Sequence, residues 1–133
     1  MRLTLRHELM FTTMTVVHRG VEIVVADVLV DTGAASTVVN ADVVAAGGLV
    51  PEPDDVLRAL RGVGGREHVF VRRLERLVVG GVAVAPFEVE VGEMDYGITM
   101  GGILGMDYLR AVGAVVDVGA LHLRSRGAPQ DTR

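Results

Sequence analysis

The chain contains no cysteine, no tryptophan and no lysine, and aromatic residues make up only 4% of it. Without cysteine it can form no disulfide framework, no thiolate nucleophile and no metal site with sulfur ligands. Without lysine, its glycine-rich stretch at residues 62–65 cannot be a phosphate-binding loop, which needs a lysine and a following helix. With three phenylalanines and two tyrosines, the core must be packed mainly by valine, leucine and alanine.

Long apolar runs and a strong basic charge are also missing. No apolar run approaches the roughly 20 residues that a membrane span needs, and residues 1–8 interrupt their apolar residues with charges, unlike a signal peptide. The net charge is −4, and no concentrated basic patch marks a nucleic-acid site. We therefore expect a soluble, cytoplasmic protein that binds neither membranes nor nucleic acids.

The composition that is present favours an all-β fold with one or two short helices. The 133 residues fit a single domain, half of them are hydrophobic, and valine-rich stretches alternate with many of the 17 glycines. Glycine turns predict hairpins over residues 9–25, 74–91 and 114–123, the second interrupted at Pro86. Short helices are predicted over 41–46, capped by Asn40, and over 106–111.

The most informative stretch is the apolar strand Val28–Val30, which runs straight into Asp31-Thr32-Gly33-Ala34. It places a carboxylate at the edge of the hydrophobic core, on a tight turn. Asp-Thr-Gly also closes strands in proteins where it has no catalytic role, because Asp and Gly suit turns. The tripeptide alone therefore leaves both interpretations open.

Two further features follow Asp31 in a fixed order. About thirty residues later comes a hairpin with a glycine tip, Gly62-Val63-Gly64-Gly65, and near the end comes Ile103-Leu104-Gly105 before a short helix. Taken together, the three motifs resemble the retropepsin-like aspartic proteases, the retroviral proteases and their single-lobe bacterial relatives. The resemblance covers residues 9–124, with an extension at 1–8 and a flexible tail at 125–133.

The resemblance implies a single-lobe, closed, β-barrel-like fold and a homodimeric endopeptidase without a cofactor. Asp31 of each subunit would be the catalytic acid, supported by Thr32, Gly33 and Ala34. Gly62, Val63, Gly64 and Gly65 would form a flap over a peptide or protein substrate. Ile103, Leu104 and Gly105 would pack beside the Asp31 turn and hold it rigid. Asp107 is expected to start the helix rather than to act as a third catalytic carboxylate.

The chemistry of two carboxylates fits this interpretation. Two carboxyl groups held close together share one proton, because both cannot ionise at short range, and the pair can activate water and polarise a carbonyl. This chain has only one Asp-Thr-Gly, so the second carboxylate must come from a second copy on a two-fold axis. Ala34 offers no hydroxyl to the carboxylates, so we predict activity at milder pH than a pepsin-like enzyme. An optimum near pH 2 would contradict this.

Two alternatives to a stable, active dimer stay open. The first is a peptide-binding or dimerisation module without cleavage, since Arg66, Glu67 and His68 place charge just after the hairpin tip. The second is a monomer with half a site, activated by association. In the retroviral proteases the terminal strands of the two subunits interleave, and the sequence does not decide whether they do so here.

The remaining polar residues carry weaker signals. The histidines at 7, 18, 68 and 122 lack metal-ligand spacing, so no metal site is predicted. Glu52, Asp54 and Asp55 lie in a loop with two prolines and are expected to be solvated. The basic residues Arg72, Arg73 and Arg76 are expected to form a solvated strand face. Ser36 has no candidate base near it in the sequence, which disfavours a serine nucleophile.

Overall fold

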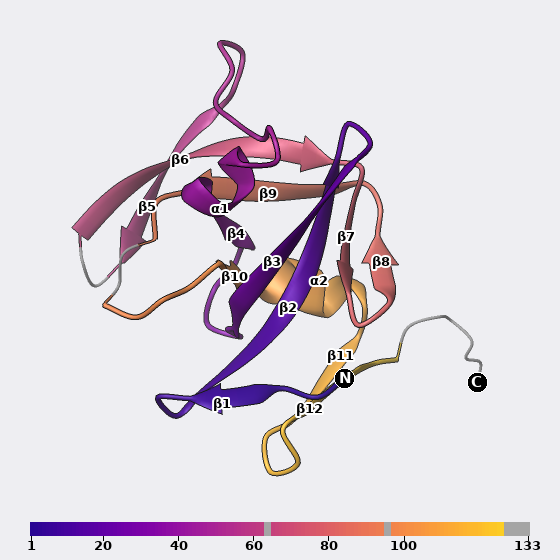
Figure 1. Cartoon of the computed structure of the whole chain (residues 1–133). Coiled ribbons are helices and arrows are strands. Elements are labelled where there is room, and N and C mark those ends of the chain that lie inside the picture. The colour runs from indigo at the N-terminus through magenta and orange to yellow at the C-terminus, as the bar shows by residue number, and fades with distance from the viewer. Residues whose placement is uncertain (63–64, 95–96, 127–133) are drawn as a thin grey trace.

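The computed structural model describes residues 1–62, 65–94 and 97–126, with side chains at all of these except 60–62 and 65–67. The described residues form a ten-stranded sheet, a separate two-stranded sheet and two short helices (Figure 1). The all-β fold class predicted from the sequence is therefore confirmed.

The longest hairpin joins β2 (Leu9–His18) to β3 (Val21–Val30) and leads the chain to Asp31. Positive φ angles at Arg19–Gly20 fit a tight two-residue turn between the strands. The predicted hairpin is confirmed, and its second strand runs on to the residue before Asp31. A register shift along β2 marks a bulge, which bends the hairpin.

The centre of the sheet is β10 (Gly102–Leu104), which lies between β3 and β4 (Val38–Asn40). β10 runs parallel to β3 and antiparallel to β4, which follows the loop of residues 31–37, here called the Asp31 loop. A Cβ atom on Gly102 would lie 2.7 Å from the carbonyl oxygen of Val38, so a larger residue would push the two strands apart. The predicted Ile-Leu-Gly segment therefore lies beside the end of β3.

The sheet extends outward from this centre on both sides. Beyond β4 lie β9 (Phe87–Gly92), β6 (Gly65–Leu74) and β5 (Leu57–Gly62), and beyond β2 lie β7 (Arg76–Val79) and β8 (Val82–Val84). The predicted interruption at Pro86 is confirmed, because β8 ends at Val84 and β9 begins at Phe87, and proline cannot donate to a ladder.

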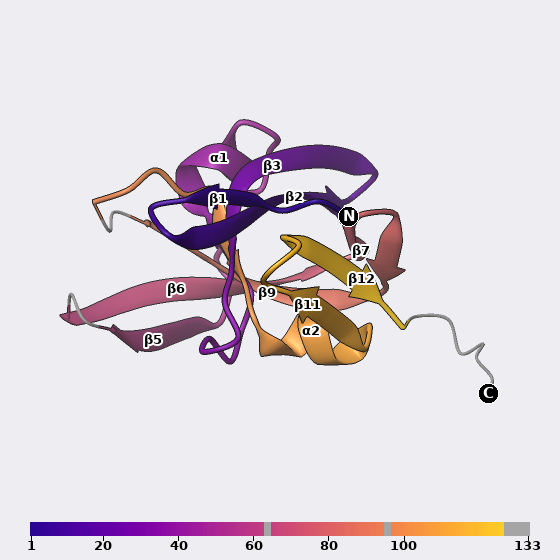
Figure 2. The same ribbon diagram turned by 90° about the horizontal axis from the view of Figure 1, so that it is seen from below.

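The predicted barrel closure is wrong. Among the described residues, β5 and β8 are the two ends of the sheet and do not pair with each other. Figure 2 shows the sheet folded over instead, with β2 and β3 in one layer and β5, β6 and β9 in the other. Two packed layers bury the apolar faces of both halves without requiring the end strands to meet.

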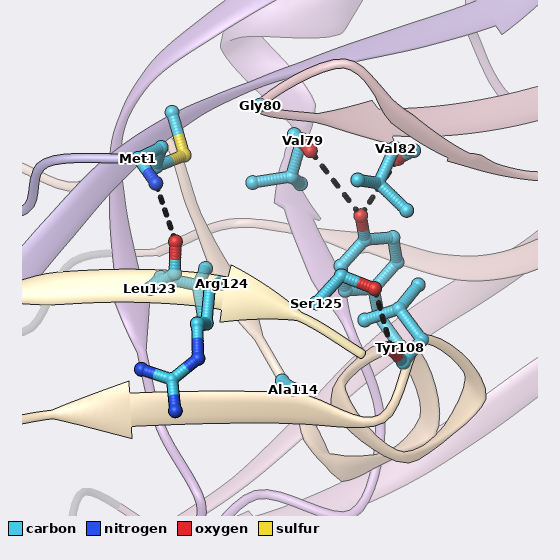
Figure 3. A pocket seen from close by; sticks show the side chains of 10 residues that line it. Met1, Val79, Gly80, Val82, Tyr108, Ala114, Leu123, Arg124 and Ser125 are labelled. Atoms are coloured by element: carbon cyan, nitrogen blue, oxygen red, sulfur yellow. Dashed lines mark hydrogen bonds between the residues drawn. The ribbon is translucent and has the colours of Figure 1, made fainter. Parts of the chain in front are cut away.

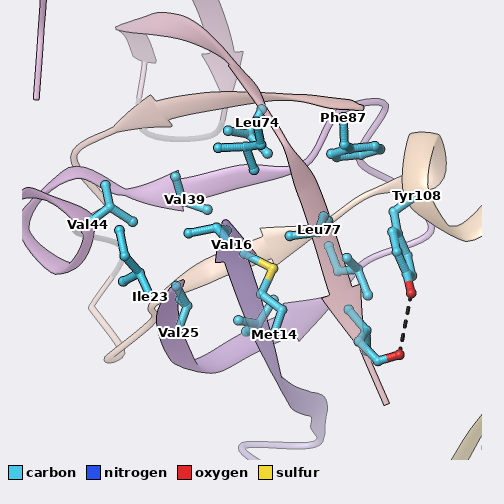
Figure 4. Close-up of a cluster of buried hydrophobic side chains, with 14 of the residues drawn as sticks. Met14, Val16, Ile23, Val25, Val39, Val44, Leu74, Leu77, Phe87 and Tyr108 are labelled. Atoms are coloured by element: carbon cyan, nitrogen blue, oxygen red, sulfur yellow. Dashed lines mark hydrogen bonds between the residues drawn. The ribbon is translucent and has the colours of Figure 1, made fainter. Parts of the chain in front are cut away.

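Valine and leucine fill most of the core between the layers, as the scarcity of aromatic residues predicts (Figure 4). The largest buried aromatic side chain is Tyr108, whose ring meets Phe87 edge-on with centroids 6.1 Å apart. Its hydroxyl donates to the carbonyl oxygen of Val82 at 2.7 Å. Burial raises the pKa of Tyr108 to about 12, so the hydroxyl stays a donor at all working pH values.

The helices lie at the ends of the two central strands. α1 (Ala41–Ala45) begins after Asn40, whose side chain accepts from the N–H of Asp42 at 3.0 Å, so the predicted cap is confirmed. α2 (Met106–Ala111) begins directly after Gly105. Neither helix is long and apolar enough to cross a membrane, and the same holds for the rest of the described residues.

The two ends of the chain pair with each other. β1 (Thr4–Arg6) lies along β2, and the final hairpin consists of β11 (Ala114–Asp117) and β12 (His122–Ser125). The N–H of Leu3 donates to Leu121 at 2.8 Å, and the N–H of Leu123 donates to Met1 at 2.8 Å. Residues 1–3 therefore pair with the final hairpin through an isolated bridge between Arg2 and His122.

Candidate active site

Asp31 follows β3 on a tight turn. Its N–H donates to the carbonyl oxygen of Leu104 at 3.0 Å, which fastens the turn to β10. Its half-buried carboxylate accepts the N–H of Gly33 through Oδ1 at 2.8 Å. A Cβ atom on Gly33 would lie 3.1 Å from that same oxygen, so glycine leaves the carboxylate uncrowded.

The Asp31 loop is also attached to the start of α2. The N–H of Met106 donates to the carbonyl oxygen of Ala34 at 2.8 Å. Gly105 lies so close to the loop that a Cβ atom there would be 2.5 Å from the carbonyl oxygen of Ser36. Gly105 is therefore needed for the close packing of two backbone segments, a role that depends on its missing side chain.

A threonine and an aspartate join the other end of the loop to α2. The fully buried Thr37 donates its hydroxyl to Oδ1 of Asp107 at 2.7 Å and its N–H to Oδ2 at 3.1 Å. The same hydroxyl accepts the N–H of Gly105 at 3.1 Å, and Asp107 accepts the N–H of Tyr108. Asp107 is in the first turn of α2, as predicted, whereas Thr37 carries no signal in the sequence, because its partner lies 70 residues away.

The carboxylates of Asp31 and Asp107 differ in how many hydrogen bonds they already accept. A carboxylate offers about four acceptor sites. Asp107 accepts three hydrogen bonds from its neighbours, whereas Asp31 accepts one from side chains or backbone within the described residues. Thr32 and Gly33, next to Asp31, are exposed. The Asp31 carboxylate therefore keeps room for a water, a substrate atom or another carboxyl group.

Six residues on neighbouring strands lie opposite one another in register and form a row across the sheet, which passes the end of β3. Its members, in order, are Phe11, Leu29, Ile103, Val38, Glu90 and Val71. Leu29 lies two residues before Asp31, so this part of the row lies beside the Asp31 loop. The first four members belong to a small apolar cluster that is separate from the main core.

Glu90 is the one acid in this row. It is 2% exposed, and its Oε2 accepts from Arg58 at 2.8 Å. No donor among the described residues reaches its Oε1. The predicted flap begins on the strand that carries Arg58, because β5 and β6 form an antiparallel hairpin that ends with the pair Gly62 and Gly65. The other two predicted flap residues, Val63 and Gly64, lie outside the described residues.

The family model for aspartyl proteases matches residues 14–108, well over half of the chain and including Asp31. The chain belongs to the aspartyl protease family. Membership supports a peptidase activity and agrees with the all-β architecture. No curated protein matches the chain in a sequence comparison.

Away from Asp31, this member of the aspartyl protease family holds a partly buried ionic cluster. Arg72 is 7% exposed and binds both carboxylate oxygens of Asp55, with Nη2 at 2.9 and 2.7 Å. Nη2 also donates to the carbonyl oxygen of Val50 at 2.9 Å. Nearby, Arg19 makes a two-pronged pair with Glu52 at 2.6 and 2.9 Å.

His18 completes this group, here called the Arg72 cluster (Arg72, Asp55, Glu52, Arg19 and His18). Its Nε2 lies 3.4 Å from Nη1 of Arg72. Burial and the charges of Arg19 and Arg72 lower the pKa of His18. The hydrogen bond from Arg72 lowers the pKa of Asp55, and the one from Arg19 lowers the pKa of Glu52.

The prediction of solvated charges is therefore wrong for Arg72 and Asp55, whereas Glu52 is partly exposed and Asp54 and Arg73 are exposed. The physical reason is strand alternation, because consecutive side chains point to opposite faces of a sheet. Arg72 and Arg73 cannot both face solvent on β6, so one of them must enter the interior with a counter-charge.

Metal ligands do not gather near Asp31. Among the described residues, no group of three or more His, Asp or Glu side chains is placed to hold a metal ion. His68 is exposed, as predicted, whereas His18 is buried in the Arg72 cluster. No sequence pattern signals that burial, because His18 ends an ordinary amphipathic strand.

Proposed function

We propose that this chain is a homodimeric, retropepsin-like aspartic endopeptidase of the single-lobe bacterial type. The observation that supports this most directly is the Asp31 carboxylate. It stands on a loop fastened at three points, yet it accepts only one hydrogen bond from the described residues. A rigid loop around an acid with free acceptor sites is what general acid–base chemistry needs.

In the proposed reaction, the two Asp31 carboxyl groups of a dimer share one proton. The ionised group takes a proton from a water molecule, whose oxygen attacks the peptide carbonyl carbon, while the protonated group donates to the carbonyl oxygen. The tetrahedral species then collapses as its C–N bond breaks and the amine leaves with a proton. The products are an acid and an amine, and neither metal nor cofactor takes part.

The remaining predicted site residues have supporting roles in this proposal. Thr32 would brace the two loops against each other across the two-fold axis, and Gly33 lets the substrate approach the carboxylates. Gly62, Val63, Gly64 and Gly65 would form the flap over an extended peptide, and Ile103, Leu104 and Gly105 would support the loop. Leu29 and Ile103, which are partly exposed beside the Asp31 loop, support a substrate with apolar side chains next to the scissile bond.

The test is Asp31→Asn, which keeps the shape and the acceptor for Gly33 but removes the shared proton. We expect kcat on a broad peptide library to fall by at least about 100-fold, the usual share of general acid–base catalysis. The unfolding midpoint in urea should be unchanged. Asp54→Asn, which alters an exposed aspartate, is the matched control and should keep full activity. Cleavage that survives Asp31→Asn would refute the mechanism.

Mixing the two forms tests whether the site is shared between two chains. An excess of the Asp31→Asn protein should suppress wild-type cleavage, because mixed dimers carry one carboxylate each. If activity stays proportional to the wild-type protein alone, each chain works independently and the shared pair is wrong.

The same proteins distinguish the proposed protease from the alternative, a peptide-binding module. A wild-type protein that binds peptides between pH 4 and pH 7 but never cleaves them would favour binding over catalysis. The charge that follows the hairpin tip is the sequence feature that keeps this alternative in view.

A further inference from the structure

The edge where residues 1–3 meet β12 is already occupied within one chain. Leu3 and Leu121 are joined by a backbone hydrogen bond, as are Leu123 and Met1. The terminal ammonium group of Met1 also donates to the carbonyl oxygen of Leu123 (Figure 3). These backbone groups are therefore not free to pair with the terminal strands of another molecule.

One apolar pocket of about 430 Å³ lies beside Val30, the residue before Asp31. Its walls come from the β1–β2 turn and the β11–β12 turn. Three large apolar side chains at this pocket and its rim are unusually exposed: Leu5 at 48%, Leu9 at 39% and Val118 at 66%. A cluster of exposed aliphatic residues marks an interaction surface.

A second pocket, of about 480 Å³, lies beside Thr32, the residue after Asp31. It is formed by α2 and β11, and its apolar lining includes Met106, Leu109 and Val116. The two pockets thus adjoin the residues on either side of Asp31. Each has one charged side chain in its lining, Glu8 in the first pocket and Arg110 in the second.

We infer that a second copy of this chain covers both pockets, so that the dimer forms through this surface and without exchange of terminal strands. The inference rests on the proposed function, because a shared proton requires two copies of Asp31 on the two-fold axis. A two-fold axis beside Asp31, at right angles to the line that joins the two pockets, would bring the first pocket of one copy opposite the second pocket of the other. Glu8 of each copy then faces Arg110 of the other copy, so two pairs of opposite charges form across the contact.

The first test places a charge on the surface. Val118→Glu should raise the dimer dissociation constant at least tenfold in sedimentation equilibrium, because a carboxylate would be buried in an apolar contact. Val24→Glu is the matched control, since Val24 is 65% exposed, as Val118 is at 66%, but belongs to neither pocket. It should leave the dissociation constant unchanged.

Equal dissociation constants for the two variants would overturn the inference, and so would a wild type that stays monomeric at every concentration. These readouts do not depend on cleavage. If Val118→Glu disrupts the dimer but the wild-type dimer cleaves no peptide, the proposed function is wrong and the inferred dimer surface is supported. A dimer that cleaves peptides and whose dissociation constant is unchanged by Val118→Glu would support the proposed function and overturn this inference.

The second test uses the absence of cysteine, which makes any introduced thiol unique. Arg2 and His122 are opposite each other in the bridge between the termini, flanked by the two backbone hydrogen bonds. Such a non-hydrogen-bonded antiparallel pair brings the Cα atoms within about 4.5 Å, which suits a disulfide.

The double variant Arg2→Cys with His122→Cys, once oxidised, should run as a single chain on a non-reducing denaturing gel while remaining a dimer in sedimentation. His122→Cys alone gives the background of bonds between chains. A covalent dimer well above that background would mean that the terminal strands interleave, and it would overturn the inference.

Discussion

The Asp31 loop and the Arg72 cluster both hold an aspartate beside a buried part of the sheet, but they use its carboxylate differently. Asp55 is bound through both oxygens by one guanidinium group, which lowers its pKa. Asp31 is held almost entirely through its backbone, and its carboxylate accepts one hydrogen bond within the described residues. A carboxylate saturated by its neighbours stabilises the fold, and one left with free acceptor sites can react.

The same contrast appears within the active-site region itself. Asp107 accepts three hydrogen bonds and joins the Asp31 loop to α2, so it serves the loop in the way that Asp55 serves β6. The comparison therefore separates two kinds of substitution. Changes in the Arg72 cluster should alter stability without altering catalysis, whereas changes in the side chains that fasten the Asp31 loop to α2 should alter both.

The largest effect on stability is expected from Arg72→Met. Removing one partner of a buried ion pair costs about 3 kcal/mol of unfolding free energy, because the other partner keeps its burial without its counter-charge. Urea unfolding measures the loss, and kcat at a temperature where both proteins are folded should stay unchanged. Arg73→Met, on the exposed neighbour, is the control. If both variants unfold at the same urea concentration, the cluster does not hold the fold.

A smaller loss of stability, joined to a loss of activity, is expected from Thr37→Val. The valine removes the hydroxyl that donates to Oδ1 of Asp107, and it leaves the N–H of Gly105 without its acceptor, at a cost of about 2 kcal/mol. Because the loop then shifts, kcat should fall about tenfold while KM changes little. Thr37→Ser should restore both, and Thr13→Val, on an exposed residue of β2, should change neither. Loss of stability with full kcat would show that Thr37 does not position Asp31.

The smallest expected effect is on how stability varies with pH, and it tests the role of His18 in the Arg72 cluster. Since the pKa of His18 is lowered from 6.5 on folding, its contribution to stability is full above that pH and is lost as the pH falls through the folded value. Arg19 and Arg72 oppose its charging, whereas Glu52 and Glu75 favour it.

His18→Gln should therefore remove this decline, so that its unfolding free energy varies less than that of the wild type between pH 7 and pH 5. The lowered pKa values of Asp55 and Glu52 produce a similar decline only at lower pH, so this window isolates the histidine. Identical pH profiles for the two proteins would show that His18 does not titrate against the cluster.

Much of the fold follows from short-range features that the sequence displays. Arg19–Gly20 and Gly80–Gly81 form turns with positive φ, and Asn40 caps its own helix, so each acts within a few residues. The strand that ends at Asp31 and the Ile-Leu-Gly strand were also predictable, because valine-rich runs bounded by turn residues favour strands. The family motif then located the candidate carboxylate.

Other features depend on residues far apart in the chain. Thr37 and Asp107 are separated by 70 residues, and Arg72 and Asp55 by 17, so no local pattern pairs them. The open ends of the sheet were missed for the same reason, because whether β5 and β8 meet depends on how the two layers pack.

The sequence by itself determined the strand content, the turns and the position of Asp31, because these depend on backbone preferences and on hydrophobic periodicity along the chain. Only the tertiary structure decided which carboxylates are saturated and which is left with free acceptor sites. It also decided that residues 1–3 pair with residues 121–123. These outcomes depend on which backbone and side-chain groups meet after the sheet has folded over, and that contact is not encoded in any short stretch of residues.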